Sequence, residues 1–231
     1  MNDDSNTGWN TGRNLLKDFS WYLLSSFLPL LVGFVKTPIF TRHFGTEDFG
    51  SLGIVQATFS YLGMLLFTWI ASILWRYYQK YKIEGRLATL FGHLMIFAGA
   101  SLVLLTIGSG AWYYLEAKAL VRELIVLSFL HLIFSQLVMG YLVAARLEAK
   151  AKLYTIFQSS RALLSFLLSL YLVFVRGDSI AALVTGLMVM DGLSLVILAL
   201  WNPIGLQIRF NVFSKDWKEL FGKHVESVDS L

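Results

Sequence analysis

Long apolar stretches alternate with short polar ones along almost the whole chain. Six of the apolar stretches are long enough to cross a bilayer, which takes about 20 residues in a helix. They lie at residues 19–41, 50–75, 88–115, 120–144, 153–175 and 180–202. The pattern therefore predicts an all-α integral membrane protein, with six transmembrane helices contained in residues 18–204.

The two ends of the chain lack this apolar pattern. Residues 1–17 are polar and rich in Asn, Asp, Gly and Thr, and we expect them to form a disordered cytoplasmic tail. The apolar run that follows is longer than the roughly 7–15-residue core of a signal peptide, and no small-residue cleavage site follows it. We therefore interpret this run as a retained first span. Residues 205–231 are predicted to form a second cytoplasmic tail.

Composition supports a membrane protein and excludes several other classes. The chain is 56% hydrophobic and 15% charged, whereas soluble domains carry about 25% charged residues. The absence of cysteine excludes disulfides and thiolate metal sites, and no paired-histidine motif is present, so we expect neither a metal nor a cofactor. Basic residues lie between the spans and not on one face, which argues against a nucleic-acid partner.

Basic residues alternate from one connector to the next. One set of connectors and tails carries thirteen, namely Arg13, Lys17, Arg76, Lys80, Lys82, Arg86, Arg146, Lys150, Lys152, Arg209, Lys215, Lys218 and Lys223. The other set carries four, namely Arg42, Lys118, Arg122 and Arg176. Because cytoplasmic loops carry the excess of Lys and Arg, both termini are predicted to be cytoplasmic.

Some polar residues lie within the apolar spans and recur at helical spacing, so that they share one face. The clearest set, in span 153–175, is Tyr154, Gln158, Arg161, Ser165 and Ser169. A charge within a span costs roughly 3 kcal/mol on insertion scales. Lys36 therefore either snorkels to the nearby surface or faces a hydrated cavity. Arg161 either pairs with Asp191 of the last span or faces water, and these two alternatives do not exclude each other.

Smaller polar residues in the spans have a simpler interpretation. Ser165 and Ser169 are spaced as small residues are at close helix–helix contacts in membranes. His93 and His131 are each the lone histidine of a span. We interpret both as hydrogen-bonded packing residues in preference to a proton relay.

One stretch of the sequence resembles a known family. TPIFTRHFGTEDFGSLGIVQATFSYLGMLL, followed by ILWRYYQKY, has a proline near the end of the first span, a short G-x-x-x-F-G turn and an Arg-aromatic-aromatic run after the second. This order and spacing resemble the opening of the bacterial polysaccharide flippases, transporters of O-antigen and lipid-linked oligosaccharide in the MATE-like superfamily. Weaker similarity continues to about Phe221, which corresponds to one six-helix lobe of a MATE-like transporter.

The resemblance implies a flippase in a bacterial inner membrane, acting in polysaccharide, O-antigen or lipopolysaccharide biosynthesis. Its substrate would be a polyprenyl-diphosphate-linked oligosaccharide, in contact with membrane lipid. Lys and Arg side chains would attract the diphosphate, and Arg can bind it with bidentate hydrogen bonds. Amide side chains can hydrogen-bond the polar glycan. The candidate substrate-binding residues are Lys36, Arg42, Gln56, Arg76, Gln158 and Arg161, with Asp191 as a charge partner.

A typical member of this family would enter a seventh span near Phe221, where this chain reads GKHVESVDSL. We therefore expect a truncated form or one half of a two-part transporter. Its partner would be a separately encoded second lobe or a second copy of the chain.

Other function classes stay open at this point. A drug or cation antiporter of the same fold should carry carboxylates within its spans. Here the carboxylate of Asp191 is set beside two cations, Lys36 and Arg161. A non-transporting assembly subunit is a further alternative. We do not expect an enzyme, because the acidic residues between the spans are isolated and His131 has no second catalytic group at a useful spacing.

Overall fold

The computed structural model describes residues 4–176 and 179–201, which form the six long helices that the apolar pattern predicted. They are α1 (Asp4–His43), α2 (Thr46–Ile83), α3 (Leu87–Leu115), α4 (Ala119–Leu147), α5 (Ala151–Tyr171) and α6 (Ala181–Trp201), with a π-helical segment, η1 (Leu172–Arg176), continuing α5. Each of the six is long and apolar enough to cross a membrane. The described residues contain no strand. The predicted all-α, six-span fold is confirmed.

The structure differs from the prediction near the start of the chain. Residues 4–17, which we expected to be disordered, are helical and continue directly into the first span as part of α1. Once a helix exists, each added residue gains a hydrogen bond without a new nucleation cost. For the same reason α2 continues past the predicted end at residue 75 to Ile83. The tail predicted at 205–231 lies outside the described residues.

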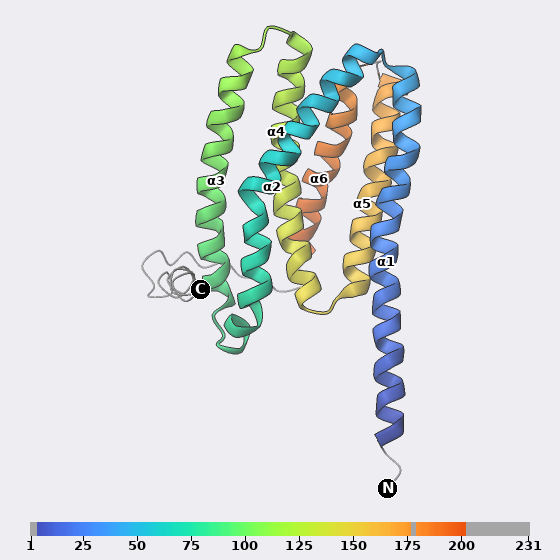
Figure 1. Cartoon of the computed structure of the whole chain (residues 1–231), viewed down its shortest axis with the longest axis vertical. Helices are drawn as coiled ribbons and strands as arrows, with labels where there is room; N and C mark the ends of the chain where they lie inside the picture. The colour runs from blue at the N-terminus through green and yellow to red at the C-terminus, as the bar shows by residue number, and fades with distance from the viewer. Residues whose placement is uncertain (1–3, 177–178, 202–231) are drawn as a thin grey trace, which may run out of the picture.

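Successive helices run in opposite directions, and α4 lies at the centre of the bundle. Helix α4 packs against α2, α3, α5 and α6, while α1 packs against α5. Figure 1 shows α2 leaning across the bundle, away from α1, after the short connector that joins them. The α2–α3 and α4–α5 connectors lie at the same end as the start of α1 (Figure 1). The basic connectors of the sequence therefore share one end of the molecule.

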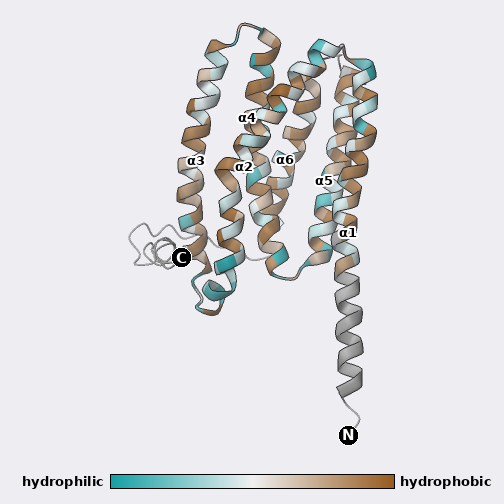
Figure 2. Ribbon diagram, viewed as in Figure 1, coloured by the Kyte–Doolittle hydropathy of each residue, from teal (hydrophilic) through white to brown (hydrophobic). Residues whose placement is uncertain are grey.

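The outer surface of the bundle is apolar. Large side chains such as Phe34, Tyr61 and Leu65 are more than two-thirds exposed, and Figure 2 shows hydrophobic residues along the helices with hydrophilic ones gathered near the connectors. A lipid environment suits this distribution, because helices satisfy their own backbone groups and apolar side chains need no water. The chain is a multi-pass membrane protein.

Hydroxyl groups link neighbouring helices inside the bundle. Ser169 donates a hydrogen bond to the Leu183 carbonyl at 3.1 Å, which joins α5 to α6. Thr155 donates to the Trp21 carbonyl at 2.8 Å, joining α5 to α1. The packing interpretation of Ser169 is confirmed. Ser165 instead bonds within its own helix, to the Ala162 carbonyl at 3.0 Å.

Helices α5 and α6 approach most tightly at Gly186. A methyl group at this position would overlap the Ser169 hydroxyl and lie 2.9 Å from the Ser169 Cα and backbone nitrogen. Because backbone atoms cannot move aside easily, Gly186→Ala is expected to destabilise the protein by about 1–3 kcal/mol. The matched control is Gly192→Ala on the same helix, whose methyl group would lie at an ordinary 3.5 Å from the Phe134 ring. Thermal unfolding in detergent measures both, and equal melting temperatures for the two variants would contradict the prediction.

The end of α2 is tied to the α4–α5 connector through Glu148. Tyr78 donates to Glu148 Oε1 at 2.6 Å and Lys82 donates to Oε2 at 2.7 Å. The pKa of Glu148 is lowered, mainly by the hydrogen bond from Lys82 and to a smaller extent by the hydrogen bond from Tyr78. Both bonds favour the charged carboxylate over the neutral acid.

This shift makes part of the stability pH-dependent. A carboxyl whose folded pKa is lowered stabilises the fold above its unfolded pKa, about 4.3 for Glu, and loses that contribution as the pH falls through its folded pKa. When the pH is lowered from about 6 to about 3, the melting temperature of the wild type should therefore fall by more than that of Glu148→Gln. If the melting temperatures of the two proteins changed with pH in parallel, the contacts of Glu148 would contribute nothing to stability.

Candidate functional site

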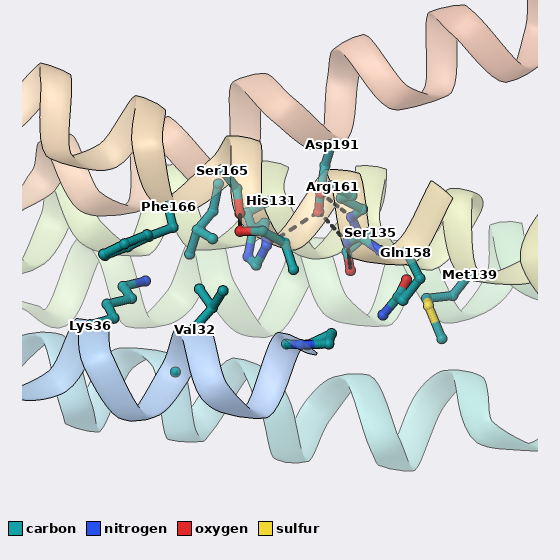
Figure 3. Close-up of a pocket in the computed structure, with 14 residues that line it drawn as sticks. Val32, Lys36, His131, Ser135, Met139, Gln158, Arg161, Ser165, Phe166 and Asp191 are labelled. Carbon is teal, nitrogen blue, oxygen red and sulfur yellow. Dashed lines mark hydrogen bonds and ion pairs between the residues drawn. The ribbon is translucent and has the colours of Figure 1, made fainter. Parts of the chain in front are cut away.

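A polar pocket lies inside the bundle among four helices. It has a volume of about 360 Å³ and is lined by α1, α4, α5 and α6. Its polar lining residues are Lys36, His131, Ser135, Gln158, Arg161, Ser165 and Asp191, and its apolar ones include Val32, Met139 and Phe166. Figure 3 shows these side chains converging from the four helices.

An ion pair between Arg161 of α5 and Asp191 of α6 forms the centre of this pocket. Arg161 Nε donates to Asp191 Oδ1 at 2.5 Å, and Arg161 Nη2 donates to Oδ2 at 2.7 Å. The pairing that the sequence suggested is therefore present. Arg161 also lines the pocket, a position compatible with the second alternative.

Two side chains of α4 complete the cluster. Ser135 accepts a hydrogen bond from Arg161 Nη2 at 2.9 Å, and His131 Nε2 lies 3.3 Å from Asp191 Oδ2. Asp191 is only 2% exposed, so its carboxylate depends on these partners for the solvation that burial removes. Sequence reasoning did not include His131 or Ser135 among the site residues. Their spacing of four on one helix face was the available signal.

Lys36 of α1 supplies a second positive charge. It is half-buried, it lines the pocket, and Figure 3 shows its side chain directed toward Phe166. Within residues 4–176 and 179–201, no carboxylate pairs with it. Of the two alternatives for Lys36, the structure agrees with the cavity.

Gln158 lies one turn before Arg161 on the same face of α5, and it too lines the pocket. Its carbonyl oxygen, Oε1, is buried and accepts no hydrogen bond from the described part of the chain. Three of the six residues predicted to bind substrate, Lys36, Gln158 and Arg161, are thus brought together.

The other three predicted residues do not line this pocket. Gln56 and Arg76 are on α2, which leans away from α1 and contributes no lining residue. Arg76 is exposed near the opposite end of α2 from the α1–α2 connector, with its guanidinium 5.5 Å from the Tyr77 ring centre. Arg42 is exposed in the last turn of α1. Gln56 and Arg76 are kept from the pocket by the lean of α2 away from α1, and Arg42 lies beyond the pocket on α1.

The charges of the pocket favour an anionic ligand. Lys36 and Arg161 contribute two positive charges against the single negative charge of Asp191, with His131 taken as neutral. The described residues contain no group of three or more His, Asp or Glu side chains placed to hold a metal ion. The arrangement can therefore attract an anion through Lys36 and the Arg161 face, and can hydrogen-bond an uncharged polar group through Gln158.

Fold and site together define a multi-pass membrane protein with a polar, net positive pocket between its helices. The family model described as polysaccharide biosynthesis protein matches residues 15–223. That match covers most of the 231 residues, and the chain belongs to this family. Searches of the curated proteins and of the solved structures gave no match.

Proposed function

We propose that the protein acts as a flippase, moving a polyprenyl-diphosphate-linked oligosaccharide across a bacterial inner membrane for the synthesis of O-antigen or another surface polysaccharide. The observation that carries the proposal is the net positive pocket at Lys36 and Arg161, which is lined by side chains of four apolar helices. A diphosphate is expensive to bring into an apolar layer, and fixed cations in a polar pocket offset part of that cost. Membership of the polysaccharide biosynthesis family supports the same substrate class.

Each part of the pocket has a role in this proposal. Lys36 supplies a point charge for the diphosphate, while Asp191 holds the Arg161 guanidinium in one orientation. The apolar outer surface of the helices accommodates the polyprenyl tail in lipid. A cation antiporter would need a carboxylate open to its substrate, and Asp191 is already bonded to Arg161 and close to His131.

We also propose that a second six-helix body, either a separate lobe or another copy of this chain, supplies the facing wall. Transporters with repeated halves place the substrate site between the halves and move one half against the other. Within this chain the pocket is lined by α1, α4, α5 and α6, while α2 leans away from α1 and contributes no wall to it.

The function can be tested by complementation. Residues 1–231 are expressed in a bacterial strain lacking its polysaccharide flippase, with and without a co-expressed C-terminal lobe from a related transporter. The proposal expects surface polysaccharide to return in at least one of the two strains. Folded protein in the membrane of both strains, with lipid-linked oligosaccharide still accumulating inside, would refute it.

We propose that the end of the bundle carrying the α2–α3 and α4–α5 connectors faces the cytoplasm, because the basic residues of the connectors gather there. The chain has no cysteine, so single cysteines can be introduced on a clean background. Lys152→Cys should react with a membrane-impermeant thiol reagent only in inverted vesicles, and Asp48→Cys only in intact cells. The reverse labelling pattern would invert the topology.

A further inference from the structure

We propose that Gln158 is a specificity-determining residue that binds the sugar attached directly to the diphosphate. This inference rests on the proposed function and identifies which part of the substrate one side of the pocket recognises.

The polar groups are arranged in sequence along the pocket. Figure 3 shows Lys36 beside Phe166 at one end, Arg161 with Asp191 in the middle, and Gln158 beside Met139 at the other end. Gln158 and Arg161 are three residues apart in α5, so they lie on one face about 4.5 Å apart along the axis. A ligand that contacts both Lys36 and Gln158 therefore passes the Arg161 side chain.

The polar side chains in the middle of the pocket already have hydrogen-bond partners within the protein. Arg161 is bonded to Asp191 and Ser135, and His131 lies within 3.3 Å of Asp191. Lys36 and Gln158 differ from this group, since the described residues offer neither side chain a hydrogen-bond partner. Buried polar atoms are nearly always hydrogen-bonded, so the buried Gln158 Oε1 is the exception in this pocket. These two ends are the groups left for a ligand.

The two ends require different chemistry. The Lys36 ammonium is a donor only, which suits the oxygens of a diphosphate. The Gln158 amide can donate through Nε2 to a sugar or a phosphate oxygen, but its unsatisfied atom is the acceptor Oε1, to which an ionised diphosphate has no proton to donate. A sugar has hydroxyl groups, and an acylamino sugar also has an N–H, either of which satisfies a carbonyl oxygen. The ligand is therefore oriented with its diphosphate at Lys36 and Arg161 and its first sugar at Gln158.

The experiment compares the binding of two lipids to purified protein comprising residues 1–231. One is a short-chain polyprenyl diphosphate, and the other is the same lipid carrying a single N-acetylhexosamine. Gln158→Met keeps the size of the side chain but removes both hydrogen-bonding groups. We expect this variant to bind the sugar-bearing lipid about tenfold more weakly than the wild type, as for the loss of a hydrogen bond. Its affinity for the bare diphosphate should not change.

Two controls separate the inference from the proposed function. Gln136→Met, on α4 and outside the pocket lining, should leave the affinity for both lipids unchanged, while Lys36→Gln should weaken both. Equal effects of Gln158→Met on the two lipids, or no effect on either, would overturn the role of Gln158 and leave the flippase proposal intact. Wild-type protein that binds neither lipid, whether alone or with the co-expressed C-terminal lobe, would overturn the proposed function and this inference with it. Gln158→Leu is the second apolar replacement if the Met variant does not elute as a single folded species.

Discussion

Asp191→Asn is expected to remove most of the folded protein, and adding Arg161→Gln to it should restore a large part. The carboxylate of Asp191 receives two hydrogen bonds from Arg161, at 2.5 and 2.7 Å, inside a helix bundle. Removing one partner of a buried pair leaves the other charge uncompensated, at a cost of about 3–5 kcal/mol. The double variant has no buried charge at this position, so it avoids that cost.

The measurement is the amount of monodisperse protein after detergent extraction, together with its melting temperature, for both single variants and the double variant. Glu47→Gln is the matched control, since it breaks an ion pair of similar length, 2.6 Å to Lys118, that is exposed at the surface. An exposed pair contributes little, and this variant should behave like the wild type. If the double variant gave as little folded protein as Asp191→Asn alone, the stabilising effects of the two residues would not depend on each other.

The parts of this molecule that the sequence predicts are those fixed by the membrane itself. The six spans follow from apolar length, because only a helix of about 20 residues satisfies its backbone across a bilayer. The contact of Arg161 with Asp191 was also foreseeable, since two opposite charges deep in separate spans are both costly alone. Neither inference requires knowledge of how the helices are arranged around one another.

The parts that the sequence does not predict depend on helix arrangement. Gln56 was predicted to bind substrate together with Gln158, but α2 leans away from the pocket and carries Gln56 with it. His131 was interpreted as a hydrogen-bonded packing residue, but its neighbour Asp191 could not be named from the sequence because it lies 60 residues later and two helices away. Helix propensity also fails to place the start of α1, because residues 4–17 continue an existing helix despite their polar composition.

The cluster and the unpaired lysine have different energetic roles. Arg161, Asp191, Ser135 and His131 contact one another, so their loss should be seen first in stability. Lys36 makes no such contact within the described residues, and a lone charge in a membrane span is a cost to folding. Its presence is therefore best explained by a ligand, and its loss should be seen first in function.

Lys36→Gln is accordingly expected to lose most transport while the amount of folded protein stays near that of the wild type. A hydrogen bond to a charged group contributes about 1.5–3 kcal/mol, which corresponds to a roughly 10- to 150-fold weaker interaction with the diphosphate. Lys36→Arg keeps the charge and should retain much of the activity. The assay is restoration of surface polysaccharide in a flippase-deficient strain, normalised to the protein extracted from the membrane.

Arg42→Gln provides the matched control for this change. It removes a positive charge from the same helix, less than two turns further along, but from an exposed position outside the pocket. Full activity of Arg42→Gln beside a strong defect in Lys36→Gln would show that the location of the charge matters and not its number. If both variants restored polysaccharide equally well at equal protein levels, Lys36 would not contact the transported anion, and the positive pocket could not be the substrate site.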